Sequence, residues 1–142
     1  MKNILVVLAI LLTVSVAFAH DETKNLKVRT VVKSTKSWDG KTLPAYGKGQ
    51  PEITILEIEV PPKTKLPVHN HPYINAGVLI SGKLKVVTEE DEVLILEPGD
   101  PIVEVIGKWH YGFNEQDTPA KIIVFYAGVK GEPTTIKQEK TK

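Results

Sequence analysis

The chain has 142 residues, of which 42% are hydrophobic and 25% are charged, and it contains no cysteine. This is ordinary globular composition for a single domain, and it excludes a disulfide-stapled scaffold, an iron–sulfur protein, a thiolate zinc site and a cysteine nucleophile. A formal net charge of +1 gives no electrostatic case for nucleic acid as a partner.

Residues 1–19 have the pattern of a secretory signal peptide. Lys2 precedes an apolar run, and residues 17–19 read Ala-Phe-Ala, an A-x-A cleavage pattern. The alternative is a membrane anchor, but the apolar run of about 15 residues is shorter than the roughly 20 that a spanning helix needs. We therefore predict cleavage after residue 19, a periplasmic or secreted protein, and no stable membrane anchor after cleavage. His20 would then be the N-terminus, where its amine and ring nitrogen together can chelate copper, although any chain cut at this position would share that feature by accident.

The rest of the chain consists of short alternating or apolar segments separated by turn signals. The segments predicted to be strands are residues 26–32, 53–60, 75–80, 82–88, 92–96, 101–106, 109–114 and 121–126. The fourth and fifth of these segments, 82–88 and 92–96, look like a hairpin with an acidic turn. No segment shows a sustained 3.6-residue period, so the sequence predicts an all-β sandwich or barrel over residues 20–130.

Two further stretches have weaker secondary-structure signals. Residues 33–50, which contain several lysines and glycines, give no clear secondary-structure signal. Residues 131–142 are polar and rich in lysine, and we predict that they form a solvated, flexible C-terminal tail.

Three histidines have a spacing that favours a metal site. His69 and His71 are two residues apart, so on a strand they point to the same face with Cβ atoms about 6.5 Å apart. His110 follows Gly107 at the start of another predicted strand, and a curled sheet can bring it opposite the pair. Imidazoles that converge in this way form a facial metal site with open positions. The alternative is that the pair are surface histidines, which would give the same His-x-His spacing.

The wider pattern resembles the two signature motifs of the cupin superfamily. Residues 69–82 resemble the first motif, with the His-x-His pair, then three residues, then Asn75, then six residues and a glycine. Residues 99–114 resemble the second, with Gly, five residues, Val-Ile-Gly, two residues, His110, three residues and Asn114. The resemblance covers residues 52–128. It implies a single-domain cupin-type β-barrel (a double-stranded β-helix or jelly roll), metal ligands at His69, His71 and His110, and a homodimer.

The sequence departs from the family pattern at three positions. Lys63 stands where the first glycine is expected, and Val105 stands where proline is expected. The third departure affects the chemistry, because Asn75 replaces the glutamate that is usually the fourth metal ligand. An amide oxygen is neutral and a weaker donor, so a three-histidine site would carry the full charge of the ion and favour an anionic substrate or dioxygen on its open positions. The alternative is a decayed site that binds metal weakly or not at all.

The surroundings of the predicted site are less specific. Tyr73 is a candidate substrate-binding residue, with a surface turn as the alternative. By strand parity Trp109, Tyr111 and Phe113 point away from the face of His110, so we expect them in the core or an interface. Glu104 is expected to be exposed, although its side chain can reach the rim of the site.

Three functions are compatible with these residues. The first is an exported cupin enzyme that uses iron, manganese, nickel, copper or zinc on a small, anionic molecule, in an oxygenase-type or related metal-centred reaction. The second is a non-catalytic periplasmic module that binds a metal ion or a small ligand. The third is a structural or interaction protein whose histidines pack in the interior. An open cavity with converging imidazoles would favour the first two over the third.

Overall fold

The computed structural model describes residues 26–139, which form ten β-strands and no helix. Within these residues, therefore, no helix is long and apolar enough to span a membrane. The predicted signal peptide, His20 and the last three residues of the predicted tail lie outside the described range. Cleavage after residue 19 and export accordingly stay predictions.

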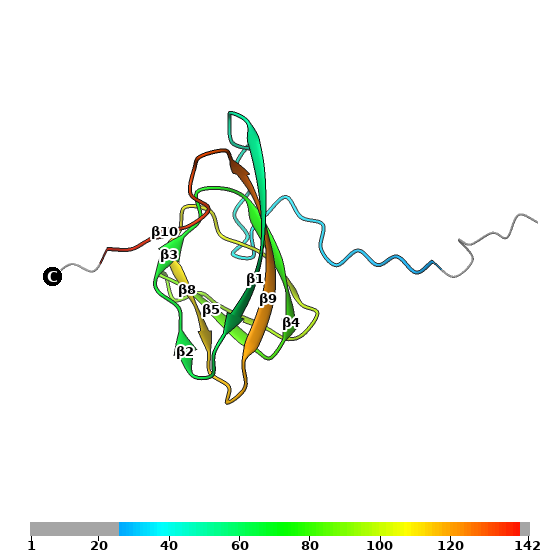
Figure 1. Cartoon of the computed structure of the whole chain (residues 1–142), viewed down its shortest axis with the longest axis vertical. Coiled ribbons are helices and arrows are strands. Elements are labelled where there is room, and N and C mark those ends of the chain that lie inside the picture. Colours follow the sequence, from blue (N-terminus) through cyan, green and yellow to red (C-terminus); the bar gives the residue numbers. More distant parts are fainter. Residues whose placement is uncertain (1–25, 140–142) are drawn as a thin grey trace, which may run out of the picture.

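The strands form two antiparallel sheets that face each other around one interior (Figure 1). The first sheet contains, in spatial order, β1 (Pro51–Val60), β9 (Ala120–Val129), β4 (Asn75–Ser81) and β7 (Pro101–Val103). The second contains, in spatial order, β10 (Ile136–Lys137), β3 (His69–Asn70), β8 (His110–Asn114), β5 (Leu84–Thr88) and β6 (Val93–Leu96), with β2 (Thr64–Lys65) also paired to β8. This arrangement confirms the predicted all-β barrel.

Alternation along the strands builds the core between the sheets. Every second residue of β9 is buried from Ala120 to Tyr126, while residues between them, such as Phe125, face outward. The inward side chains of both sheets pack into one cluster, in which Leu79 and Val60 are fully buried. Apolar burial of this kind contributes roughly 25 cal/mol for each Å² removed from water, and it holds the two sheets together.

Most of the predicted strands are confirmed, with shifted ends. The hairpin of β5 and β6 around the acidic turn is present, and its strands pair from Leu84 with Leu96 to Val87 with Val93. β7 stops at Val103, earlier than predicted, whereas β9 continues to Val129 along its partner β1. Gly82 and Gly107 both have positive φ angles, which the lack of a Cβ atom permits in the turns they form.

Residues 26–32 were predicted to form a strand, and this prediction is wrong. The segment has no strand partner among the described residues, and Figure 1 shows it running away from the barrel in blue. Leu26 is 71% exposed and Val28 is 83% exposed. Alternation alone does not make a strand, since an extended segment needs a neighbour to satisfy its backbone groups.

The C-terminal stretch also differs from the prediction of a free, flexible tail. Ile136 and Lys137 form β10, which pairs with Asn70 and His69 of β3. The backbone of Gln138 donates a further hydrogen bond to the carbonyl of Val68 (3.0 Å). The side chains of β10 are exposed, but its backbone adds an edge strand to the second sheet.

Candidate metal centre

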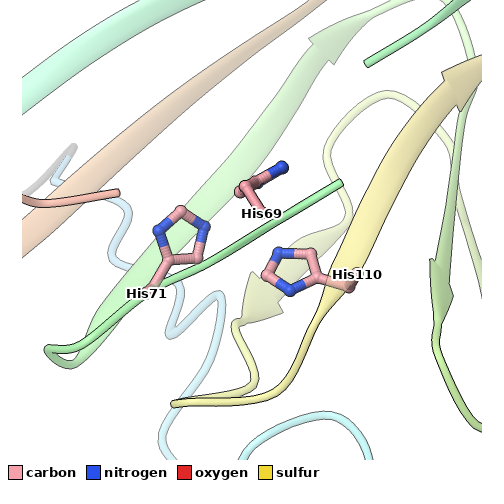
Figure 2. Close-up of side chains that lie close together, drawn as sticks. All are labelled: His69, His71 and His110. Carbon is pink, nitrogen blue, oxygen red and sulfur yellow. The ribbon is translucent and has the colours of Figure 1, made fainter. Parts of the chain in front are cut away.

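The fold brings His69, His71 and His110 together. His69 on β3 lies directly opposite His110 on β8, so the two side chains share one face of the sheet. His71 follows β3 and is held by a bridge to Ile106, where the amide of Gly107 donates to its carbonyl at 2.9 Å. One nitrogen from each imidazole lies within 4.8 Å of the other two, and Figure 2 shows the rings gathered at one place.

Backbone carbonyls fix the tautomer of all three rings. Nδ1 of His69 is 2.7 Å from the carbonyl oxygen of Pro67, and Nδ1 of His110 is 2.9 Å from that of Lys108. Nδ1 of His71 is 2.9 Å from the carbonyl oxygen of Thr134, in the segment that leads to β10. A carbonyl only accepts, so each Nδ1 carries the proton and each Nε2 keeps a lone pair. This is the tautomer that a metal-ligating histidine needs.

Burial keeps these imidazoles neutral. It lowers the pKa of His71 to about 4 and that of His110 to about 4, against the pull of their backbone carbonyls. Burial also lowers the pKa of His69. At neutral pH the three rings are therefore in the uncharged form that donates a lone pair to a cation.

Glu104 lies at this site, although the sequence led us to expect an exposed side chain. The residue is only 8% exposed, and its Oε2 is 3.6 Å from Nε2 of His110. Burial raises the pKa of Glu104 to about 7. The missed signal was parity, because Glu104 interrupts an apolar run two residues after the fully buried Ile102 and so shares its inward face.

Two residues singled out from the sequence lie differently from expectation. Tyr73 is a candidate substrate contact, but its ring packs beside Gly47 and Gly128, away from the residues that line the histidine cavity. The turn between His71 and β4 directs it there. Asn75 is 1% exposed, and its Nδ2 donates to the carbonyl of Tyr73 at 3.2 Å. Asn75 is thus buried at the edge of the site without lining the cavity.

Asn114, at the end of β8, is hydrogen-bonded to the backbone of neighbouring segments. The side chain of Asn114 donates to the backbone carbonyls of Val60 and Thr118 at 3.0 and 2.8 Å, and its own oxygen accepts from the amide of Gln116. Gly112 faces the cavity with His110, while Tyr111 and Phe113 point the other way, as parity predicts. Asn114 therefore has a structural role, and it keeps β8, and with it His110, in register.

The space beside the histidines is small and has an open side. An inner cavity of about 50 Å³ is lined by the three histidines, Glu104, Tyr126 and apolar side chains of both sheets. This exceeds the roughly 10–15 Å³ that one water needs, so an ion with a few small ligands fits. A second space of about 180 Å³ adjoins it, and Lys137 of β10 lies among its lining residues beside His69 and Tyr126.

An ion-pair network holds the loop that contains Lys108, whose backbone carbonyl accepts the hydrogen bond from Nδ1 of His110. Nζ of Lys108 lies 2.9 Å from Asp39, 2.8 Å from Glu90 and 2.8 Å from Glu92. The side chain of Lys108 is 6% exposed and that of Asp39 is fully shielded. This network ties residues 35–43 and the β5–β6 turn to the residue whose carbonyl orients the imidazole of His110.

The donor set fits a metal ion. In the described part of the chain, Nε2 of His110 and Oε2 of Glu104 are buried, lie 3.6 Å apart and have no hydrogen-bond partner. Buried polar atoms without partners are rare because each one costs free energy, and a cation between these two would satisfy both. Three neutral imidazoles with a nearby carboxylate suit a divalent transition metal.

Comparisons with known proteins give a family match and a set of similar folds. Residues 56–126 match the family described as "Cupin domain". No curated protein matches the chain. An oxalate oxidase solved in complex with glycolate is 20% identical with a TM-score of 0.51, over 60% of this chain and 45% of that one.

Two further solved structures have the same fold. The oxalate decarboxylase of Lactobacillus farciminis, solved as a formate complex, is 21% identical with a TM-score of 0.52, over 60% of this chain and 26% of that one. A polyketide cyclase from Streptomyces resistomycificus is 17% identical with a TM-score of 0.54, over 67% of this chain and 66% of that one. The chain spans less than half the length of the oxalate oxidase, and at these identities the likeness is one of fold.

Proposed function

The chain belongs to the cupin domain family, and we propose that it is an exported, metal-dependent protein that acts on a small anionic molecule. His69, His71 and His110 hold one divalent transition metal ion: iron, manganese, nickel, copper or zinc. The reaction is metal-centred, of the oxygenase type or a related type. One observation carries the proposal, namely that all three Nδ1 atoms are committed to backbone carbonyls, which leaves three Nε2 atoms for a common ligand.

The residues of the chain prepare this site before any ion arrives. The carbonyls of Pro67, Thr134 and Lys108 orient the rings, so little side-chain freedom is lost on binding. A bound divalent ion supplies Lewis acidity, and redox chemistry if it is iron, manganese or copper. The apolar walls of the cavity exclude water and strengthen every charge interaction inside.

Charge and size support a small anion as the substrate. Lys137 lines the open space next to His69, and its Nζ provides a cation where a ligand would enter. The inner cavity of about 50 Å³ admits a molecule of a few heavy atoms. Two proteins of the same fold were solved with glycolate and formate, which are small carboxylates. A short carboxylate is therefore the substrate class to test first.

The alternative function is a non-catalytic module that binds a metal or a small ligand. The tight inner cavity favours it, because the space leaves little room for a second reactant beside the ion. The two functions share the site and differ in turnover. A metal-loaded protein that binds glycolate, formate or oxalate without converting it supports the module.

The experiment that tests the metal site is elemental analysis of the protein, purified from its export compartment without a tag or chelator. We expect about one equivalent of a single transition metal per chain, and loss of most of it in His110→Ala. His20→Ala is the matched control, because it removes the chain's fourth histidine, which is not among the three proposed ligands. A wild-type protein that is metal-free and takes up none of the five metals would refute the proposal.

A further inference from the structure

Strand pairing places Glu104, the residue after β7, beside Asn75, the position where the family pattern usually has an acidic ligand. β4 and β7 are antiparallel, with Ala76 opposite Val103, so Asn75 lies opposite Glu104. The amide of Glu104 donates to the carbonyl of Asn75 at 3.1 Å, which continues the ladder by one step. Residues opposite each other share a face, with Cβ atoms about 4.5–5.5 Å apart. A carboxylate at position 104 can therefore reach the region that a side chain at position 75 would occupy.

The side chain of Glu104 points into the cavity, whereas that of Asn75 does not. Glu104 lines the cavity together with the three histidines. Asn75 is not among the lining residues, and its amide donates to the backbone of Tyr73. The neutral amide of Asn75 therefore lies at the edge of the site, and the carboxyl group of Glu104, on the neighbouring chain segment, lies inside the cavity.

The distance between Glu104 and His110 suits two ligands of one ion. Two atoms that each lie about 2.1 Å from a metal are separated by about 3.0 Å when they are at right angles and about 4.2 Å when they are opposed. Oε2 of Glu104 and Nε2 of His110 are 3.6 Å apart, and neither has a hydrogen-bond partner in the described residues. A hydrogen bond between them is excluded by this length.

The charge of the Glu104 carboxylate also favours a cation beside it. Among the described residues, neither a lysine nor an arginine pairs with Glu104. An isolated carboxylate at this depth costs several kcal/mol, a cost that a divalent ion against the oxygen would remove. Resting on the proposed function, we infer that Glu104 is the fourth protein ligand of the metal site and supplies the carboxylate that Asn75 lacks.

The test compares wild-type protein with Glu104→Gln, using Co²⁺ as the probe. We expect Co²⁺ affinity to fall at least tenfold in Glu104→Gln and the visible absorption of the Co²⁺ complex to change, because a ligand is lost. The metal-free variant should be as heat-stable as wild type or more so, since an unpaired buried carboxyl is replaced by a neutral isostere. Glu97→Gln, which makes the same change in an exposed ion pair, is the matched control and should leave affinity and spectrum unchanged.

The outcomes separate this inference from the proposed function. A wild-type protein that does not bind Co²⁺ refutes both. Wild-type binding with a Glu104→Gln affinity within threefold and an unchanged spectrum overturns the inference and leaves the three-histidine site standing. A lower affinity with an unchanged spectrum also overturns it, because loss of an outer partner alone can weaken a metal tenfold or more. If Glu104→Gln does not fold, Glu104→Asp serves instead: a shortened carboxylate should shift the spectrum, and an unshifted spectrum overturns the inference.

Discussion

The ion pair between Asp39 and Lys108 gives a prediction whose size and pH dependence both follow from the structure. Burial by itself would raise the pKa of the Asp39 carboxyl. Hydrogen bonds from Ser37, Lys108 and the amide of Lys41, together with the charge of Lys108, lower it instead to about 2. The perturbation is Asp39→Asn, which keeps the shape of the side chain and removes its charge.

The magnitude comes from the difference between the two pKa values. A carboxyl with a pKa of 3.8 in the unfolded chain and about 2 in the folded chain contributes about 2–3 kcal/mol to the free energy of unfolding, at about 1.4 kcal/mol per unit. Because the folded value is the lower one, the contribution is complete above pH 3.8 and disappears as the pH falls through about 2. Asp39→Asn should therefore cost about 2–3 kcal/mol at pH 7 and progressively less below pH 4.

Urea denaturation of both proteins at pH 7 and at pH 3 or below measures this change. Glu57→Gln is the control, because its ion pair with Lys121 is exposed and such pairs contribute at most about 1 kcal/mol. A cost for Asp39→Asn that stays the same from pH 7 to pH 2 would refute the reasoning, as would a cost no larger than that of the control. The backbone carbonyl of Lys108 accepts the hydrogen bond that orients His110. Asp39→Asn loosens Lys108, so metal affinity should weaken along with stability.

Three further predictions concern the core, the surface and the C-terminal strand. Leu79→Ala, at a fully buried position, should cost about 2–5 kcal/mol in urea denaturation, and a cost below about 1 kcal/mol would contradict the packing seen here. We expect a homodimer through the exposed apolar face where Ile55 lies opposite Phe125, so Ile55→Glu should yield monomers in light scattering; a monomeric wild type would contradict it. A chain ending at residue 132 loses the carbonyl that fixes His71 and should bind metal about 10–100-fold more weakly by calorimetry, whereas wild-type affinity would show that this acceptor is dispensable.

The sequence was most informative where one local rule sufficed. Two-residue alternation located the longer strands, and the acidic turn between β5 and β6 is a local feature of a few residues. The spacing of His69 and His71, together with the second motif around His110, identified the cluster that the structure brings together. The positive φ of Gly107 is also a local property, because it depends on the lack of a Cβ atom at that one residue.

The errors in strand assignment share one cause, which is that a strand needs a partner. Residues 26–32 alternate like a strand but have no strand partner among the described residues, whereas Ile136 and Lys137 lie in a polar stretch and yet pair with β3. Pairing is decided by distant segments, so neither outcome could be derived from the local pattern. β2, β3 and β10 are only two residues long, too short for any periodicity to register.

The sequence by itself thus determined an all-β barrel with three histidines as its chemical centre. Only the tertiary structure decided the charge and tautomer of that centre. The carbonyl that orients His71 comes from Thr134, far along the chain, and the carboxyl group of Glu104 enters the cavity because β7 pairs with β4. Register between strands is set by the packing of the whole core, and that register selects which side chains face the metal site.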